Sequence, residues 1–127
     1  MMIDHFGINC ADVQASAKFY DVVLGTLGFS RQMDYGVAIG YGRDGFPWFW
    51  LSSYENLPAN REVHIAFKAE DAAAVRSFYE TALSLGAESL HAPRMWPEYH
   101  EHYYGAFVRD PDGNNIEAVT HRANEGD

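Results

Sequence analysis

The chain has 127 residues, an apolar fraction of 47% and a formal net charge of −9, which fits one compact domain or two half-domains that share a core. The negative charge, without a basic stripe to offset it, excludes nucleic acid and acidic membrane surfaces as partners. The single cysteine, Cys10, excludes an internal disulfide and a thiolate metal cluster. The N-terminal residues do not read as a signal peptide and no stretch has the length of a membrane span, so we expect a cytoplasmic protein.

The first half of the chain opens with a predicted strand over residues 2–10. Apolar and polar side chains alternate there, which puts His5 on the face opposite the more apolar one. Asp12 suits the N-cap of a helix, and Gly28 stands where that helix ends. An Arg-Asp-Gly turn at 43–45 then separates the last two of three short predicted strands. These strands cover about residues 29–34, 36–42 and 46–53.

The second half repeats this order after a predicted linker over residues 55–61. His64 lies 59 positions after His5 at the start of a predicted strand, and Asp71 suits the N-cap of the helix that follows. Each half therefore reads strand, helix, strand, strand, strand, and a histidine opens both copies. Such a repeat brings two imidazoles into symmetric positions, as in a small metal site. The last three predicted strands cover about residues 87–92, 103–109 and 114–120.

The second copy carries extra length over residues 91–102, which we expect to be a functional loop because of its prolines, histidines and charges. A histidine beside a bound substrate can act as a general base, since its pKa lies near neutrality. His100 is the first candidate for that role, and Tyr104 is the second. The alternative is that this loop is a solvated edge. Arg94 could bind a carboxylate or phosphate of a substrate, or pair with an acidic side chain.

The stretch Gly-Ala-Phe-Val-Arg-Asp-Pro-Asp-Gly-Asn-Asn-Ile-Glu, residues 105–117, resembles the last hairpin of the vicinal oxygen chelate superfamily. That superfamily includes glyoxalase I, fosfomycin-resistance thiol transferases, extradiol dioxygenases and bleomycin-resistance proteins. The resemblance covers about residues 2–121 and implies an α+β fold. Two tandem βαβββ modules, over about 2–54 and 62–121, would form a curved, half-barrel-like mixed sheet with the helices on the outside.

The resemblance also implies that metal ligands come from the first and last strands of each module. Those positions hold His5, His64 and Glu117, while the fourth falls on Phe49 or Trp50, neither of which binds a metal. The set is similar to the three ligands of fosfomycin-resistance transferases and extradiol dioxygenases rather than the four of glyoxalase I. Two imidazoles and one carboxylate suit a divalent iron, manganese, nickel or zinc ion with open coordination positions.

Three functions follow from this pattern, all with a small-molecule substrate or ligand. The first is a metal-dependent enzyme that acts as a Lewis acid on a vicinal-oxygen substrate, as a lyase, isomerase or transferase. The second is an iron-dependent ring-cleaving dioxygenase, and the third is a metal-free binding protein of bleomycin-resistance type. The residues expected to line the pocket are Trp50, Arg94, Trp96 and Tyr99. The resemblance implies a homodimer, in which His5 joins the other ligands either within one chain or across the interface.

Overall fold

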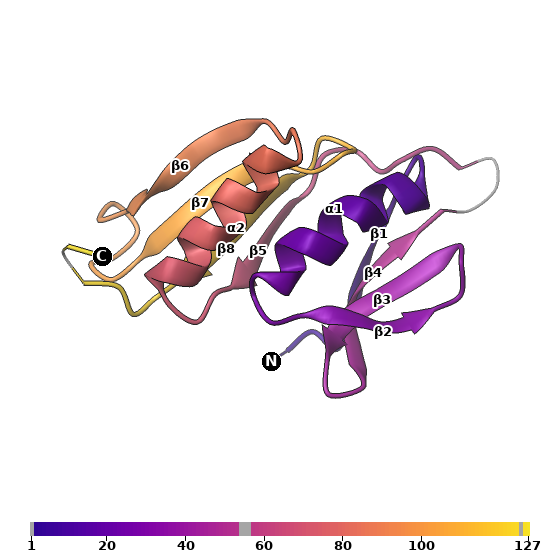
Figure 1. The fold of residues 1–127 in the computed structure, drawn as a ribbon, viewed down its shortest axis with the longest axis horizontal. Coiled ribbons are helices and arrows are strands. Elements are labelled where there is room, and N and C mark those ends of the chain that lie inside the picture. The colour runs from indigo at the N-terminus through magenta and orange to yellow at the C-terminus, as the bar shows by residue number, and fades with distance from the viewer. Residues whose placement is uncertain (1, 54–56, 125) are drawn as a thin grey trace.

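The first module of the computed structural model is a four-stranded sheet with one helix (Figure 1). The structure describes residues 2–53, 57–124 and 126–127, so the predicted linker 55–61 lies partly outside it. The sheet has the order β1-β4-β3-β2, with β1 parallel to β4 and the other pairs antiparallel. Its elements are β1 (Phe6–Asn9), α1 (Val13–Gly25), β2 (Ser30–Asp34), β3 (Ala38–Arg43) and β4 (Phe46–Ser52).

The second module repeats the same path. Its sheet has the order β5-β8-β7-β6, again with only the first pair parallel. Its elements are β5 (His64–Lys68), α2 (Ala72–Ser84), β6 (Ser89–Met95), β7 (Tyr104–Arg109) and β8 (Asn115–Thr120). The α+β fold of two βαβββ modules is therefore confirmed. Each module keeps a four-stranded sheet of its own, open at its edges, where we expected one curved sheet.

The two helices begin where the sequence predicts. The Asp12 carboxylate accepts hydrogen bonds from the backbone N–H groups of Gln14 and Ala15, and Asp71 accepts one from Ala74. These bonds satisfy N–H groups that have no partner within a helix. Each helix has 13 residues, and among the described residues no helix is long and apolar enough to cross a membrane.

The helices lie side by side on one side of the molecule, each over the sheet of its own module (Figure 1). Their apolar faces and the covered faces of both sheets form one core, to which the fully buried Tyr20, Leu51, Phe78 and Ile116 belong. His5, which directly precedes β1, and His64, which begins β5, are exposed, as expected for residues on the uncovered side of each sheet. This uncovered side is called the open face below.

The turn at residues 110–113 joins the two modules. Asp110 is buried and accepts a hydrogen bond of 2.6 Å from the hydroxyl of Tyr20 in α1. Asp112 accepts hydrogen bonds from the backbone N–H of Ala11 and the hydroxyl of Ser16. The most specific motif of the sequence therefore has a structural role, because it connects the end of β7 to the helix of the other module.

The predicted loop 91–102 is shorter than expected, because β6 continues to Met95. The prolines and charges of this segment argue against a strand in the middle of a sheet. β6 is the edge strand of its sheet, and its pairing with β7 shifts register between Ser89 and His91 and again between His91 and Arg94. Pro93 is tolerated since an edge strand does not need every N–H for the ladder.

Candidate metal centre

His64 and Glu117 meet on the open face of the second module. The two strands that carry them are parallel neighbours, in which His64 pairs with Asn115 and Ala66 pairs with Glu117. His64 Nε2 lies 3.1 Å from Glu117 Oε1. The carboxylate is buried, with 1% of the residue exposed, whereas 49% of the imidazole side chain is exposed. The pair therefore combines a shielded anion with a ring that a solvent molecule, ion or substrate can reach.

The other nitrogen of His64 fixes how the ring faces the carboxylate. Nδ1 lies 3.1 Å from the backbone oxygen of Asn115, which can only accept a hydrogen bond. Nδ1 therefore carries a proton that it donates to this oxygen. The space between Nε2 and Glu117 Oε1 then has to hold a proton or a cation, because a bare nitrogen and a carboxylate oxygen would repel each other.

Burial also raises the pKa of the Glu117 carboxyl above its usual value, while the hydrogen bond from Tyr103 and the nearby His64 lower it. The Tyr103 hydroxyl donates its hydrogen bond to Oε2, the oxygen that faces away from His64. Each oxygen of Glu117 thus has its own partner. A cation near Oε1 would offset the cost of holding a carboxylate away from water.

His5 does not join this pair within one chain. Its Nδ1 lies 2.7 Å from the carboxylate of Asp4, and 62% of its side chain is exposed. Over residues 2–53, 57–124 and 126–127, no group of three or more histidine, cysteine, aspartate or glutamate side chains could hold a metal ion. One chain therefore supplies two of the three predicted ligands at one place.

Strand register identifies the counterpart of Glu117 in the first module. Gly7 pairs with Trp50 in the first module as Ala66 pairs with Glu117 in the second. The position at which the resemblance implies a fourth ligand is therefore that of Trp50, and Phe49 faces the core with 4% of its surface exposed. Trp50 stacks in parallel on Tyr35, with 6.2 Å between ring centroids. The site in the first module is an aromatic surface in place of a carboxylate.

Aromatic rings surround the His64–Glu117 pair. Phe107 pairs with Glu117 across β7 and β8 and stacks on His64 at 5.8 Å between centroids. Trp96 is buried against Phe107 at 5.3 Å and donates a hydrogen bond to the backbone oxygen of Gly105. Tyr99 is exposed and stacks on Trp96 at 5.5 Å. These rings form a wall beside the two candidate ligands.

Arg94, another predicted pocket residue, has a partner of its own. Its guanidinium lies 3.4 Å from the centroid of the Trp96 ring and 3.0 Å from the Glu98 carboxylate. That ion pair matches the second of the two roles expected for this arginine, pairing with an acidic side chain. A substrate anion would have to displace Glu98 to reach it.

The two predicted general bases lie apart from each other. His100 Nε2 is 2.7 Å from His121 Nδ1, and the His100 ring packs on Tyr103. The side chain of Tyr104 belongs to the core on the covered side of the sheet, where its hydroxyl lies 3.5 Å from Arg76 of α2. A catalytic role for His100 stays a prediction, whereas the position of Tyr104 gives it a packing role.

The predicted site residues did not include Tyr103 or Phe107, which contact the pair directly. They stand at alternate positions with Gly105, so all three share one face at this end of β7. Two features of the sequence could have identified them. The hairpin places Phe107 opposite Glu117, and alternation along the strand then puts Gly105 and Tyr103 on the same face. Tyr103 and Tyr104 are neighbours, and only the register shows which of them faces the carboxylate.

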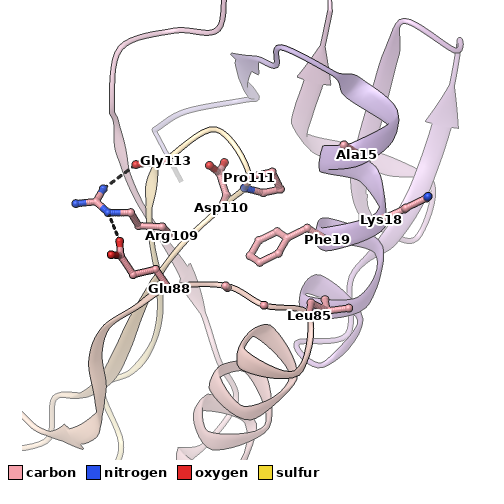
Figure 2. A pocket seen from close by; sticks show the side chains of 11 residues that line it. Ala15, Lys18, Phe19, Leu85, Glu88, Arg109, Asp110, Pro111 and Gly113 are labelled. Atoms are coloured by element: carbon pink, nitrogen blue, oxygen red, sulfur yellow. Dashed lines mark hydrogen bonds and ion pairs between the residues drawn. The ribbon is translucent and has the colours of Figure 1, made fainter.

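A hollow lies on the helix side of the molecule, between the modules (Figure 2). It has a volume of about 590 Å³ and is lined by residues of α1, the segment that follows α2, the end of β7 and the turn at residues 110–113. Figure 2 shows Phe19 and Pro111 beside it, with Arg109 held by Glu88 and by the backbone oxygen of Gly113. The predicted site residues all lie outside this lining.

Comparison with protein families gives one match over most of the chain. The family described as "Glyoxalase-like domain" matches residues 5–119. A comparison with curated proteins finds no match.

Solved structures share this fold. A glyoxalase/bleomycin resistance protein from Albidiferax ferrireducens T118 is 26% identical, with a TM-score of 0.83 over 94% of this chain and 98% of that one. A lactoylglutathione lyase from Agrobacterium tumefaciens is 22% identical, with a TM-score of 0.68 over 92% of this chain and 91% of that one. A fosfomycin resistance protein from Mesorhizobium loti is 19% identical, with a TM-score of 0.66 over 93% of this chain and 90% of that one.

Proposed function

We propose a function from the premise that the chain belongs to the glyoxalase-like domain family of the vicinal oxygen chelate superfamily. We infer that it is a small metal-dependent enzyme, with His64 and Glu117 as two ligands of a divalent ion and His5 as the third. The observation that carries this proposal is the 3.1 Å approach of His64 Nε2 to the buried Glu117 Oε1. Iron, manganese, nickel and zinc all suit such a donor set.

The two donors fit a metal ion in three respects. Nε2 and Oε1 come from neighbouring parallel strands and lie 3.1 Å apart, close enough for both to bind one ion. The carbonyl oxygen of Asn115 accepts a hydrogen bond from Nδ1 of His64, the nitrogen on the other side of the ring from Glu117. Metal-bound histidines are commonly oriented by a partner of this kind. The exposed imidazole leaves room for a substrate beside the pair.

The third donor is proposed to come from a second copy of the chain. His5 is exposed and is absent from the pair within one chain, so a homodimer that places His5 of one copy beside His64 and Glu117 of the other would complete the set. Two-fold symmetry would then give two identical sites. In each site Trp50 of the copy that supplies His5 would form an aromatic wall.

A bound divalent ion would act as a Lewis acid on two adjacent oxygens of a substrate. The residues of the chain have separate tasks in lyase, isomerase or transferase chemistry of this kind. Glu117 offsets the positive charge, and the Phe107 and Trp96 rings keep water away from one side. His100 is retained as the candidate base, on the loop that follows β6.

A metal-free binding protein is the second candidate, because both oxygens of Glu117 already have partners in His64 and Tyr103. The stack of the exposed Tyr35 on the half-buried Trp50 would then bind a planar ligand. An iron-dependent dioxygenase would use the same three ligands, and oxygen consumption with ferrous iron would distinguish it from a Lewis-acid enzyme.

The deciding experiment is metal analysis of untagged protein that has been stripped with a chelator and reloaded with each ion in turn. We expect about one metal per chain, because each chain contributes one His5, one His64 and one Glu117, and we expect loss of that metal in His64→Ala. His102→Ala removes a histidine that hydrogen-bonds the backbone of Ala123, and it should keep the metal. If the wild-type protein binds none of the four ions, the proposal is contradicted and the metal-free binding function is favoured.

A mixing experiment tests the shared site. His5→Ala and His64→Ala should each lose the metal, but a mixture of the two unfolded and refolded together should regain about a quarter of the sites, as random pairing of two chains in a two-fold dimer requires. The mixture would stay empty if all three ligands came from one chain.

A further inference from the structure

Tyr103 contacts the buried carboxylate on the side that the candidate metal ligand His64 does not reach. Its hydroxyl donates a hydrogen bond to Glu117 Oε2, while His64 Nε2 approaches Oε1. Burial, followed by the hydrogen bond to Glu117, raises the pKa of the Tyr103 phenol, so it stays a donor at neutral pH. The two oxygens of the carboxylate are therefore not equivalent.

Three further rings hold the Tyr103 ring in place. Tyr99 packs edge-on against it at 4.9 Å between centroids, and His100 and His121 do so at 5.4 and 5.2 Å. The hydrogen bond between His100 and His121 joins two of these rings to each other. The loop after β6 and the residue after β8 thus converge on one phenol, which limits the directions in which its hydroxyl can point.

Gly105 provides the space in which the phenol and the carboxylate meet. A Cβ atom at this position would lie 2.9 Å from Glu117 Oε2 and 3.3 Å from Tyr103 Cε1. The first distance is shorter than a carbon and an oxygen without a bond between them normally reach. A side chain at residue 105 would therefore displace the carboxylate, the phenol or both.

We propose that Tyr103 is a positioning residue that occupies Oε2 of Glu117 and leaves Oε1 alone to bind a metal ion beside His64. The proposal rests on the metal-dependent function inferred above. With Oε2 occupied, the carboxylate binds the ion through one oxygen, and the coordination position that Oε2 would otherwise take stays open to substrate. Hydrogen bonds of this kind to metal ligands affect metal affinity by about 10–100-fold.

The test is titration of the chelator-stripped full chain with Co²⁺, because visible absorption of Co²⁺ reports both affinity and coordination geometry. In Tyr103→Phe the ring packing is kept and the hydrogen bond is lost. We expect the Kd for Co²⁺ to rise about tenfold or more and the absorption bands to shift as Oε2 becomes free to bind. Tyr79→Phe is the matched control, since it removes a phenol of the same module that hydrogen-bonds Ser89; it should match wild type.

Gly105→Ala keeps the phenol but crowds it, so it should weaken Co²⁺ binding in the same direction, and it carries the test if Tyr103→Phe fails to fold. Wild-type protein that binds Co²⁺, with Tyr103→Phe equal to it in affinity and spectrum, would overturn the role of Tyr103 alone. Wild-type protein that does not bind Co²⁺ would overturn the metal-dependent function, and this role with it.

Discussion

The two modules follow the same chain path and differ at one equivalent position of their last strands. The strand register places Trp50 and Glu117 at equivalent positions. Trp50 lies beside β1, which His5 precedes, and Glu117 lies beside β5, which His64 begins. The first module fills that position with a ring stacked on Tyr35, and the second fills it with a buried carboxylate. A duplicated fold can therefore keep its packing while only one copy carries a carboxylate at this position.

The turns before the last strands differ in the same way. The turn in the first module is a short surface connection in which Asp44 has a φ of 56°. The turn in the second module buries Asp110, which accepts hydrogen bonds from the Tyr20 hydroxyl, the Asn114 side chain and two backbone N–H groups. Sequence similarity between two turns thus does not imply equal contributions to stability.

The largest effect expected from this comparison is on stability. Asp110→Ala removes the acceptor of those hydrogen bonds and leaves the buried Tyr20 hydroxyl without a partner, so we expect a loss of about 3 kcal/mol in the free energy of unfolding. Asp44→Asn should change the free energy of unfolding by less than about 0.5 kcal/mol, because asparagine tolerates a positive φ. Urea denaturation measures both. Equal effects of the two variants would contradict the assigned role of the second turn.

The difference in ligands can be reversed in part by Trp50→Glu. A carboxylate at this position would lie beside the strand that follows His5, as Glu117 lies beside His64, and it would complete a four-ligand set in the proposed dimer. We expect Co²⁺ affinity to rise about tenfold, which corresponds to about 1.4 kcal/mol. Trp50→Gln controls for loss of the ring. If the glutamate and glutamine variants bind Co²⁺ with equal affinity, the first module of one copy does not face the second module of the other copy.

The smallest expected effect concerns pH. The pKa of Glu117 is raised in the folded protein, so the stability that this group contributes is present below its unfolded value near 4.5 and is lost as pH rises through the folded value. In metal-free protein, Glu117→Gln should therefore equal wild type at low pH and exceed it at neutral pH by on the order of 1 kcal/mol. Glu101→Gln, at an exposed side chain, should follow the wild type.

Thermal denaturation between low and neutral pH measures the difference in stability between Glu117→Gln and the wild type. Parallel curves for Glu117→Gln and wild type would mean that the carboxylate is not destabilised by burial, which would also weaken the reason to expect a cation beside it.

Much of the fold could be predicted because its signals are local. The capping residues Asp12 and Asp71 lie next to the helices they begin, and alternation of side chains places His64 on the open face. The end of β6 could not be predicted in this way. Pro93 argues against a strand by composition, and only the position of β6 at the edge of its sheet makes the strand possible.

The sequence by itself determined the repeat, the order of strands and helices, and the residue types available as ligands, because these follow from spacing along one chain. Tertiary structure decided which of them meet. Register across β7 and β8 places Tyr103 rather than Tyr104 at Glu117, and register across β1 and β4 selects Trp50 over Phe49. A shift of one residue turns a side chain to the other face of a sheet, and pairing between strands far apart in sequence is what sets that shift.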